Sequence, residues 1–137
     1  MPDLEIDVLR KGKETSGVAL FAMLRNEIYF LPHWLQHYRD LGIKEFLLFD
    51  DRSDDGSREY LLSQDDCTLF QGNHAWGDVI RGIPFSFYIR HMICRKLGKH
   101  RWLLSVDADE FLVLPSQFES VCDPGCYQRT SSVAAGQ

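Results

Sequence analysis

Three carboxylates crowd into four residues at the end of an apolar run in this 137-residue chain. The apolar residues 102–106 lead directly into Asp107, Ala108, Asp109 and Glu110, which we call the acidic cluster. Neighbouring carboxylates repel one another and resist burial unless a cation or hydrogen bonds compensate. Mg²⁺ takes one or two carboxylates and adds water and substrate phosphates, and Mn²⁺ also suits oxygen ligands. The cluster therefore predicts a divalent-cation site for a phosphate-containing substrate; the alternative is a solvated acidic turn.

Two further groups of polar residues end apolar runs. Arg25, Asn26 and Glu27 follow residues 18–24, while Asp50 and Asp51 follow residues 45–49. In open parallel sheets, ligands bind at the carboxyl ends of the strands, so all three groups can converge on one edge although they are far apart in sequence.

The loop that continues after Asp51 reads RSDDGS and is rich in turn-forming residues. We interpret Asp54 and Asp55 as loop residues, with Asp55 or Ser57 capping a short helix that runs to about residue 64. For Asp50 and Asp51, a loop role and a binding role stay equally open.

The elements needed to position these residues follow from hydrophobic periodicity. Strands are predicted at residues 18–24, 45–49, 67–70 and 102–106, and helices after Asn26, after Asp55 and over residues 83–97. Asn26 is expected to cap the first helix, with Pro32 in its first turn. Because each crossover is long enough for parallel pairing, the fold class is α/β with an open, mostly parallel, doubly wound sheet. The strand at 102–106 is expected to be buried on both faces.

Composition indicates one globular domain, with residues 1–16 as a polar lead-in, 17–115 as the α/β domain and 116–137 as an irregular, partly disordered tail. The net charge of −5 argues against general nucleic-acid binding. No apolar run approaches the ~20 residues of a transmembrane segment, and the start does not resemble a signal peptide. The four cysteines form no dense disulfide framework, and Cys94 is expected to be a buried, reduced thiol. We therefore expect a cytoplasmic protein, or one peripheral to a membrane.

Three motifs in order resemble the nucleotide-sugar-binding half of a GT-A glycosyltransferase of the family-2-like type. They are a strand ending in R-N-E, a strand ending in a D-D-x-S-x-D-G-S loop, and a strand ending in D-x-D before E-F. The resemblance covers about residues 18–115. It implies a Rossmann-like nucleotide-binding half and a nucleotide-diphosphate sugar donor, expected to be a UDP-sugar. The acceptor could be a glycan, a lipid or a protein.

The resemblance also implies roles for individual residues. The nucleotide-sugar site would be formed by Arg25, Asn26, Glu27, Asp50, Asp51 and Asp107. Asp51, together with Asp50, would contact the base, and Asp107 would lie near the ribose and the metal. Asp109 would ligate the Mn²⁺ or Mg²⁺ that bridges the donor's diphosphate, with Asp107 as the second metal residue.

The chain departs from this pattern in two respects. Arg52 stands where many members of the family have a small residue, and only 28 residues follow Asp109, where the family has an acceptor-binding half. Neither Glu119 nor Asp123 is assigned as the general base, so the base stays unknown and we expect a truncated product.

Two alternatives remain open. A truncated, non-catalytic remnant would bind nucleotide and metal without turnover. An aspartate-nucleophile phosphohydrolase would use Asp107 as nucleophile and Asp109 as acid/base, although Phe111 stands where such motifs carry Thr or Val. An EF-hand is excluded, because Leu112 and Phe118 occupy the positions that require Gly and Glu.

Several conspicuous residues have simpler structural interpretations. His33 and His37 are four residues apart, but Trp34 replaces the Glu of a zinc-protease motif, so no zinc site is expected. Trp34 and Trp102 are expected in the core. Trp76, in a loop followed by Gly77, is the one tryptophan that is a candidate to line the site.

Overall fold

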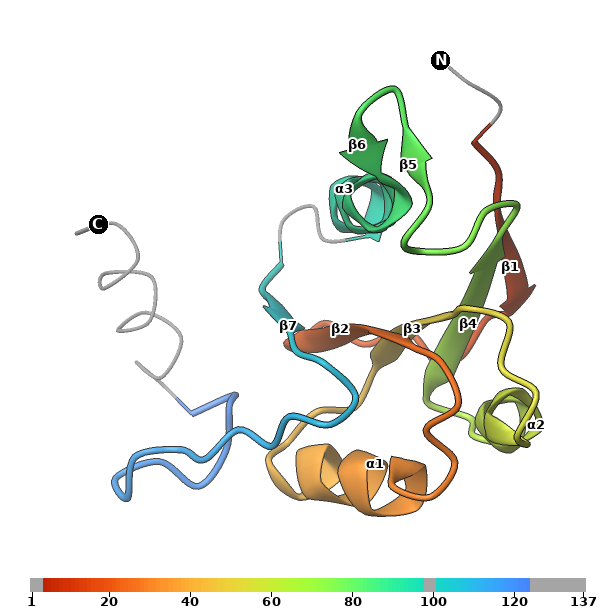
Figure 1. Ribbon diagram of the computed structural model, residues 1–137. Coiled ribbons are helices and arrows are strands. Elements are labelled where there is room, and N and C mark those ends of the chain that lie inside the picture. The colour runs from red at the N-terminus through yellow and green to blue at the C-terminus, as the bar shows by residue number, and fades with distance from the viewer. Residues whose placement is uncertain (1–3, 98–100, 124–137) are drawn as a thin grey trace.

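The computed structural model describes residues 4–97 and 101–123, which form a mixed five-stranded sheet with helices on both faces (Figure 1). The sheet order is β1-β4-β3-β2-β7. Its strands are β1 (Ile6–Arg10), β2 (Ala19–Leu24), β3 (Phe46–Asp50), β4 (Cys67–Gly72) and β7 (Leu103–Ser105). The helices are α1 (Leu31–Asp40), α2 (Ser57–Leu62) and α3 (Phe85–Leu97). A separate antiparallel pair is formed by β5 (Val79–Ile80) and β6 (Ile83–Pro84).

The pairing of the strands confirms a mostly parallel α/β arrangement. β2 pairs in parallel with both β3 and β7, and β3 pairs in parallel with β4. Only β1 is antiparallel, lying beside β4. The four parallel strands therefore end at the same edge of the sheet, the edge to which the polar groups of the sequence were assigned.

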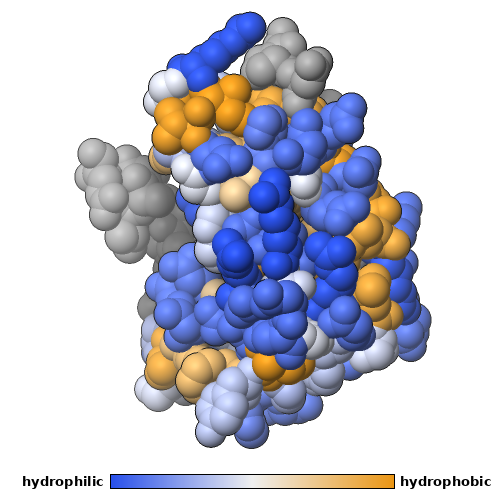
Figure 2. All heavy atoms as spheres, turned by 45° about the vertical axis from the view of Figure 1, so that its right-hand side comes forward, coloured by the Kyte–Doolittle hydropathy of each residue, from blue (hydrophilic) through white to orange (hydrophobic). Residues whose placement is uncertain are grey.

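Two hydrophobic cores flank the sheet. α1 and α2 cover one face, where Leu20, Leu48 and Trp34 are completely buried. α3 covers the other face, where Phe21, Phe49 and Phe85 have no exposed surface. In Figure 2, the side of the molecule with β1, β4 and α2 is mostly hydrophilic, with hydrophobic residues in separate patches. Within the described ranges, no helix is long and apolar enough to cross a membrane.

The first strand was not predicted. β1 lies inside the segment interpreted as a polar lead-in, and its sequence IDVLR alternates polar and apolar residues over a short length. It is stabilised by antiparallel pairing with β4, in which Ile6 lies opposite Gly72. A strand at a sheet edge needs only one buried face, so it lacks the continuous apolar run by which the central strands were recognised.

The last strand differs from its prediction. β7 has three residues rather than five, and it lies at the edge of the sheet beside β2. Its residues are half-buried or exposed, and the side chain of Trp102 is 45% exposed. The expectation that this strand is buried on both faces, with Trp102 in the core, is therefore wrong.

Two helix predictions and one cysteine need smaller corrections. α3 begins at Phe85, because Ile83 and Pro84 pair in β6 instead. Pro32 does lie in the first turn of α1, but the N-cap is Phe30 rather than Asn26. Cys94 is only half-buried, whereas Cys67 is the one cysteine within residues 4–97 and 101–123 that has no exposed surface.

The close approach of Gly72 to α3 gives a prediction for stability. A Cβ at position 72 would lie 2.8 Å from ring carbons of the buried Phe85 and 3.2 Å from the ring of Phe49. We expect Gly72→Ala to lower the free energy of unfolding by about 1–3 kcal/mol through overpacking, measured by urea denaturation. Gly77→Ala is the control, since nothing lies within 4 Å of a Cβ there. Equal effects of both substitutions would contradict this account.

Candidate functional site

A cleft of about 400 Å³ lies at the carboxyl edge of the sheet, where β2 and β7 end. It is lined by Met23, Leu24, Glu27, Trp76, Gly77, Ser86, Asp107, Ala108 and Asp109. Three of the residues predicted from the sequence, Glu27, Asp107 and Asp109, therefore meet in one concave site. They come from the loops after two neighbouring parallel strands, which is the arrangement expected for a ligand site in an open α/β sheet.

The acidic cluster is held in place by buried side chains of α1. The indole Nε1 of Trp34 donates to the backbone oxygens of Asp107 and Glu110, both at 3.1 Å. The hydroxyl of Tyr38 donates to the same Glu110 oxygen at 2.8 Å and accepts from the N–H of Leu112 at 3.0 Å. Both aromatic side chains have no exposed surface. Their hydrogen bonds fix the backbone on which the cluster is presented to the cleft.

Within the cluster the three carboxylates have different surroundings. Glu110 turns back, and its Oε1 accepts the backbone N–H of Asp107 at 2.7 Å. Asp107 and Asp109 line the cleft instead. Glu110 is thus a loop-stabilising residue, and two carboxylates remain for a ligand.

The carboxylates of the cleft repel one another. Burial raises the pKa of Asp107, and the nearby charges of Glu110 and Asp109 raise it further. Burial also raises the pKa of Glu27, with added repulsion from Asp109 and Asp55. A cation would relieve this repulsion. The part of the chain that the structure describes contains no group of three or more His, Cys, Asp or Glu residues that could hold a metal ion by themselves.

Asp50 and Asp51 are both buried, at 1% exposure, but their partners differ. Oδ2 of Asp50 accepts from Arg58 Nε at 3.0 Å and from the backbone N–H of Ser53 at 3.3 Å, while its Oδ1 has no hydrogen-bond partner among the described residues. Oδ1 of Asp51 accepts from the backbone N–H of Trp76 at 3.3 Å, while its Oδ2 has no hydrogen-bond partner among the described residues. Asp50 is therefore tied to its own loop and helix, and Asp51 adjoins a residue of the cleft wall.

The carboxylate of Asp51 is poorly compensated for a buried charge. Its Oδ2 lies 4.0 Å from the guanidinium of Arg25, which is itself half exposed. Burial raises the pKa of Asp51, against the lowering effects of the Trp76 N–H and of Arg25. A buried carboxylate with a raised pKa and an unpaired oxygen is typical of a binding site.

Asn26 connects two loops rather than capping a helix. Its backbone is left-handed, with φ of 54°, and its N–H donates to Ser53 Oγ at 2.9 Å. Its side-chain oxygen accepts the N–H of Asp54 at 2.8 Å. The loop after β2 is thus joined to the loop after β3.

Asp55 strengthens the same connection. Its carboxylate accepts from the N–H of Ile28 at 3.1 Å, and from both the N–H and the hydroxyl of Ser57. Ser57 Oγ in turn accepts the N–H of Glu27 at 3.0 Å. Asp55 therefore anchors the backbone of Ile28 directly and that of Glu27 through Ser57, by bonds that the sequence pattern did not reveal.

The predicted site residues divide into two groups. Glu27, Asp107 and Asp109 line the cleft, whereas the described lining does not include Arg25, Asn26, Asp50 or Asp51.

The cleft wall also contains Trp76 and Ser86, which were not among the residues predicted to bind the nucleotide sugar or the metal. Trp76 was a candidate from its loop context, and the structure places it in the cleft wall. Ser86, in the first turn of α3, was missed because a serine at a helix start has an ordinary capping interpretation; its N–H donates to the Trp76 oxygen at 2.9 Å.

His37 bonds the oxygen of Leu112 at 2.8 Å and stacks edge-on with Phe111, which gives it a packing role.

Comparison with known proteins relates the chain to a glycosyltransferase family. It is 26% identical over 106 residues to a glycosyltransferase family 92 protein of Ricinus communis, which covers 77% of this chain and 19% of that protein. A family 92 protein of Oryza sativa subsp. japonica is 26% identical over 103 residues, covering 75% of this chain and 17% of the relative. One of Arabidopsis thaliana is 29% identical over 117 residues, covering 80% and 19%.

The chain spans less than a fifth of the length of these three relatives. No protein-family model matches it, and no solved structure matches it significantly.

Tyr38 gives a test of how the acidic cluster is held. Tyr38→Phe removes one hydroxyl that serves both Glu110 and Leu112, so we expect a loss of about 1–3 kcal/mol in the free energy of unfolding. We also expect faster amide hydrogen exchange at Leu112, because its N–H loses its acceptor. Tyr60→Phe, at a half-buried tyrosine of α2, is the control. Unchanged exchange at Leu112 would show that the hydroxyl does not hold this segment.

Asp51 gives a prediction for pH dependence. Because its folded-state pKa is raised, the native state binds more protons than the unfolded state, and stability falls as pH rises from about 4 through the raised value. Asparagine does not titrate, so the stability of Asp51→Asn relative to wild type should increase between about pH 4 and pH 7 in denaturation experiments. Asp54→Asn controls for the change in net charge. A difference independent of pH would refute the burial argument.

Proposed function

We propose that this chain forms the donor-binding region of a metal-dependent glycosyltransferase of the GT-A type. The observation that carries the proposal is the convergence of Glu27, Asp107 and Asp109 on one cleft at the carboxyl edge of a mostly parallel sheet. The similarity to family 92 glycosyltransferases supports it. The proposed ligand is a nucleotide-diphosphate sugar, with UDP as the expected nucleotide.

Asp107 and Asp109 are the proposed residues for a Mn²⁺ or Mg²⁺ ion. Their mutual repulsion fits a cation, and a hard divalent ion needs only one or two protein carboxylates when a diphosphate supplies further oxygens. Such an ion, when bound, stabilises the negative charge that develops on a departing nucleoside diphosphate. Glu110 holds the loop in position, because its carboxylate accepts a hydrogen bond from the Asp107 N–H.

Asp51 is the proposed contact for the nucleotide base. Its unpaired Oδ2 is a hydrogen-bond acceptor, and a base N–H would satisfy it. Asp50 also has an unpaired oxygen, but it is a weaker choice because the close guanidinium of Arg58 already compensates its charge and Asp50 does not adjoin the cleft wall. Asn26 would act by positioning, since it joins the two loops that carry Glu27 and Asp51.

We propose glycosyl transfer itself for the longer family 92 relatives, of whose length this chain spans only a small part. The second candidate for the 137-residue chain is binding of the donor without transfer. The acceptor, the general base and a cytoplasmic or membrane-peripheral location stay predictions.

Calorimetric titration with UDP, with and without Mn²⁺, tests the donor site. We expect binding that requires the metal and that weakens at least about tenfold in Asp109→Asn, because a ligand of the ion is lost. Glu59→Gln, at an exposed residue of α2, is the matched control and should bind as wild type does.

Two results would separate the candidates. Metal-dependent UDP binding with no release of UDP from a UDP-sugar, in the presence of an acceptor mixture, would assign binding without transfer to this chain. Absence of UDP binding by a wild type shown to be folded by circular dichroism would reject the donor site.

A further inference from the structure

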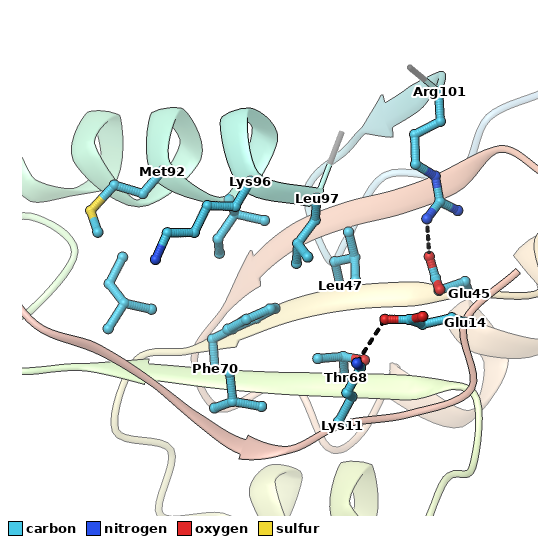
Figure 3. A pocket seen from close by; sticks show the side chains of 13 residues that line it. Lys11, Glu14, Glu45, Leu47, Thr68, Phe70, Met92, Lys96, Leu97 and Arg101 are labelled. Carbon is cyan, nitrogen blue, oxygen red and sulfur yellow. Dashed lines mark ion pairs between the residues drawn. The ribbon is translucent and has the colours of Figure 1, made fainter. Parts of the chain in front are cut away.

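A second cavity, of about 270 Å³, lies between α3 and the sheet, away from the donor cleft (Figure 3). It lies at the start of the parallel strands, since its lining includes Thr68 at the beginning of β4 and Glu45 just before β3. The donor cleft lies where the strands end, and the two have no lining residue in common. We call this second cavity the α3 groove.

The groove exists because α3 covers its face of the sheet incompletely. Strands lie about 4.8 Å apart, so five of them form a face about twice as wide as a helix of about 10 Å. α3 packs over the centre of the sheet, where Phe85 and Ile89 are fully buried. On the β1 side the coverage ends, and Val8, which lines the groove, is 55% exposed. An apolar hollow remains between α3, β1 and β4.

The body of the groove is apolar. Leu47, Phe70 and Ile93 line it from β3, β4 and α3, and each is buried. Its volume is near the lower limit of ligand pockets, which are about 300–1,000 Å³, so it suits a small apolar group.

The rim of the groove carries charge, with one cation in excess. Lys11 pairs with Glu14 at 2.8 Å, and Arg101 pairs with Glu45 at 2.5 Å. Lys96 has no ion-pair partner among the described residues. Three cations thus stand against two carboxylates, and Figure 3 shows the Lys96 side chain extending from α3 into the space between Met92 and Phe70.

Buried polar atoms without hydrogen bonds gather at one end of the groove. They are Nε of Arg101, which lines the groove, and Oγ1 of Thr15, which lies beside the lining. Oε2 of Glu45, whose side chain is 2% exposed, makes no hydrogen bond but forms the ion pair with Arg101. The Thr15 N–H donates to the other oxygen of Glu45. Such atoms cost free energy when they stay unpaired, and a polar group of a ligand or bound water would satisfy them.

We propose that the α3 groove binds a small amphipathic anion, a free medium-chain carboxylate. The aliphatic chain lies against Leu47, Phe70 and Ile93, and the carboxylate pairs with Lys96 at the rim. The apolar body and the single excess cation match this ligand in both chemistry and charge. This site is independent of the proposed donor site, so either can fail without the other.

Decanoate, below its micelle-forming concentration, is the probe, with decanol as the uncharged comparison. Calorimetry of the 137-residue chain should show saturable binding of decanoate that is tighter than that of decanol. Lys96→Met should weaken decanoate binding about threefold, as expected for an exposed charge pair, and leave decanol binding unchanged. Arg95→Met is the control, because Arg95 is exposed and adjacent in sequence but does not line the groove.

A blocking variant locates the site. Val8→Trp places a large ring over the groove from an exposed position of β1, so folding should persist while binding of both probes is lost. UDP with Mn²⁺ should not displace decanoate.

Three results would overturn the proposal. They are the absence of saturable decanoate binding by folded wild type, unchanged decanoate binding in Lys96→Met, and unchanged binding of both probes in Val8→Trp. Light scattering that shows a dimer abolished by Val8→Trp would assign the groove to a second copy of the chain instead.

Discussion

The arrangement of the candidate site depends on hydrogen bonds from α1 to the chain that follows β7. β7 has three residues and one strand neighbour, so pairing alone holds this edge weakly. Trp34 and Tyr38 are buried in the core beneath it, and their polar atoms hold the backbone of Asp107, Glu110 and Leu112. The same two aromatic rings therefore serve the hydrophobic core and the position of the acidic cluster.

At the same edge of the sheet, unfavourable electrostatic interactions lower the stability of the fold. Asp51, Glu27 and Asp107 all have raised pKa values, chiefly because they are desolvated and also because each lies near at least one other carboxylate. Carboxylates placed in this way lower stability at neutral pH. By contrast Asp50, which is equally buried, has the guanidinium of Arg58 beside it. The uncompensated acids lie in and next to the cleft, as expected where a sheet edge is arranged for a cationic partner.

Uneven covering of the sheet links the donor cleft and the α3 groove. α1 and α2 together close one face, while α3 closes only the centre of the other. At one end of that second face, Ser86 of α3 and Trp76 of the preceding loop close the donor cleft. At its other end, the space beside β1 stays open as the α3 groove. One helix thus shapes both cavities.

The sequence by itself determined the central strands and the polar residues that end them. The apolar runs before Arg25, Asp50 and Asp107 are long enough, or bounded clearly enough, to be recognised locally, and parallel pairing brings their ends together. Only the tertiary structure decided that Asn26 joins two loops, that Asp50 has a close guanidinium partner while Asp51 has only a distant one, and that an alternating edge segment becomes β1. These outcomes depend on hydrogen bonds and burial between distant segments, which hydrophobic periodicity does not encode.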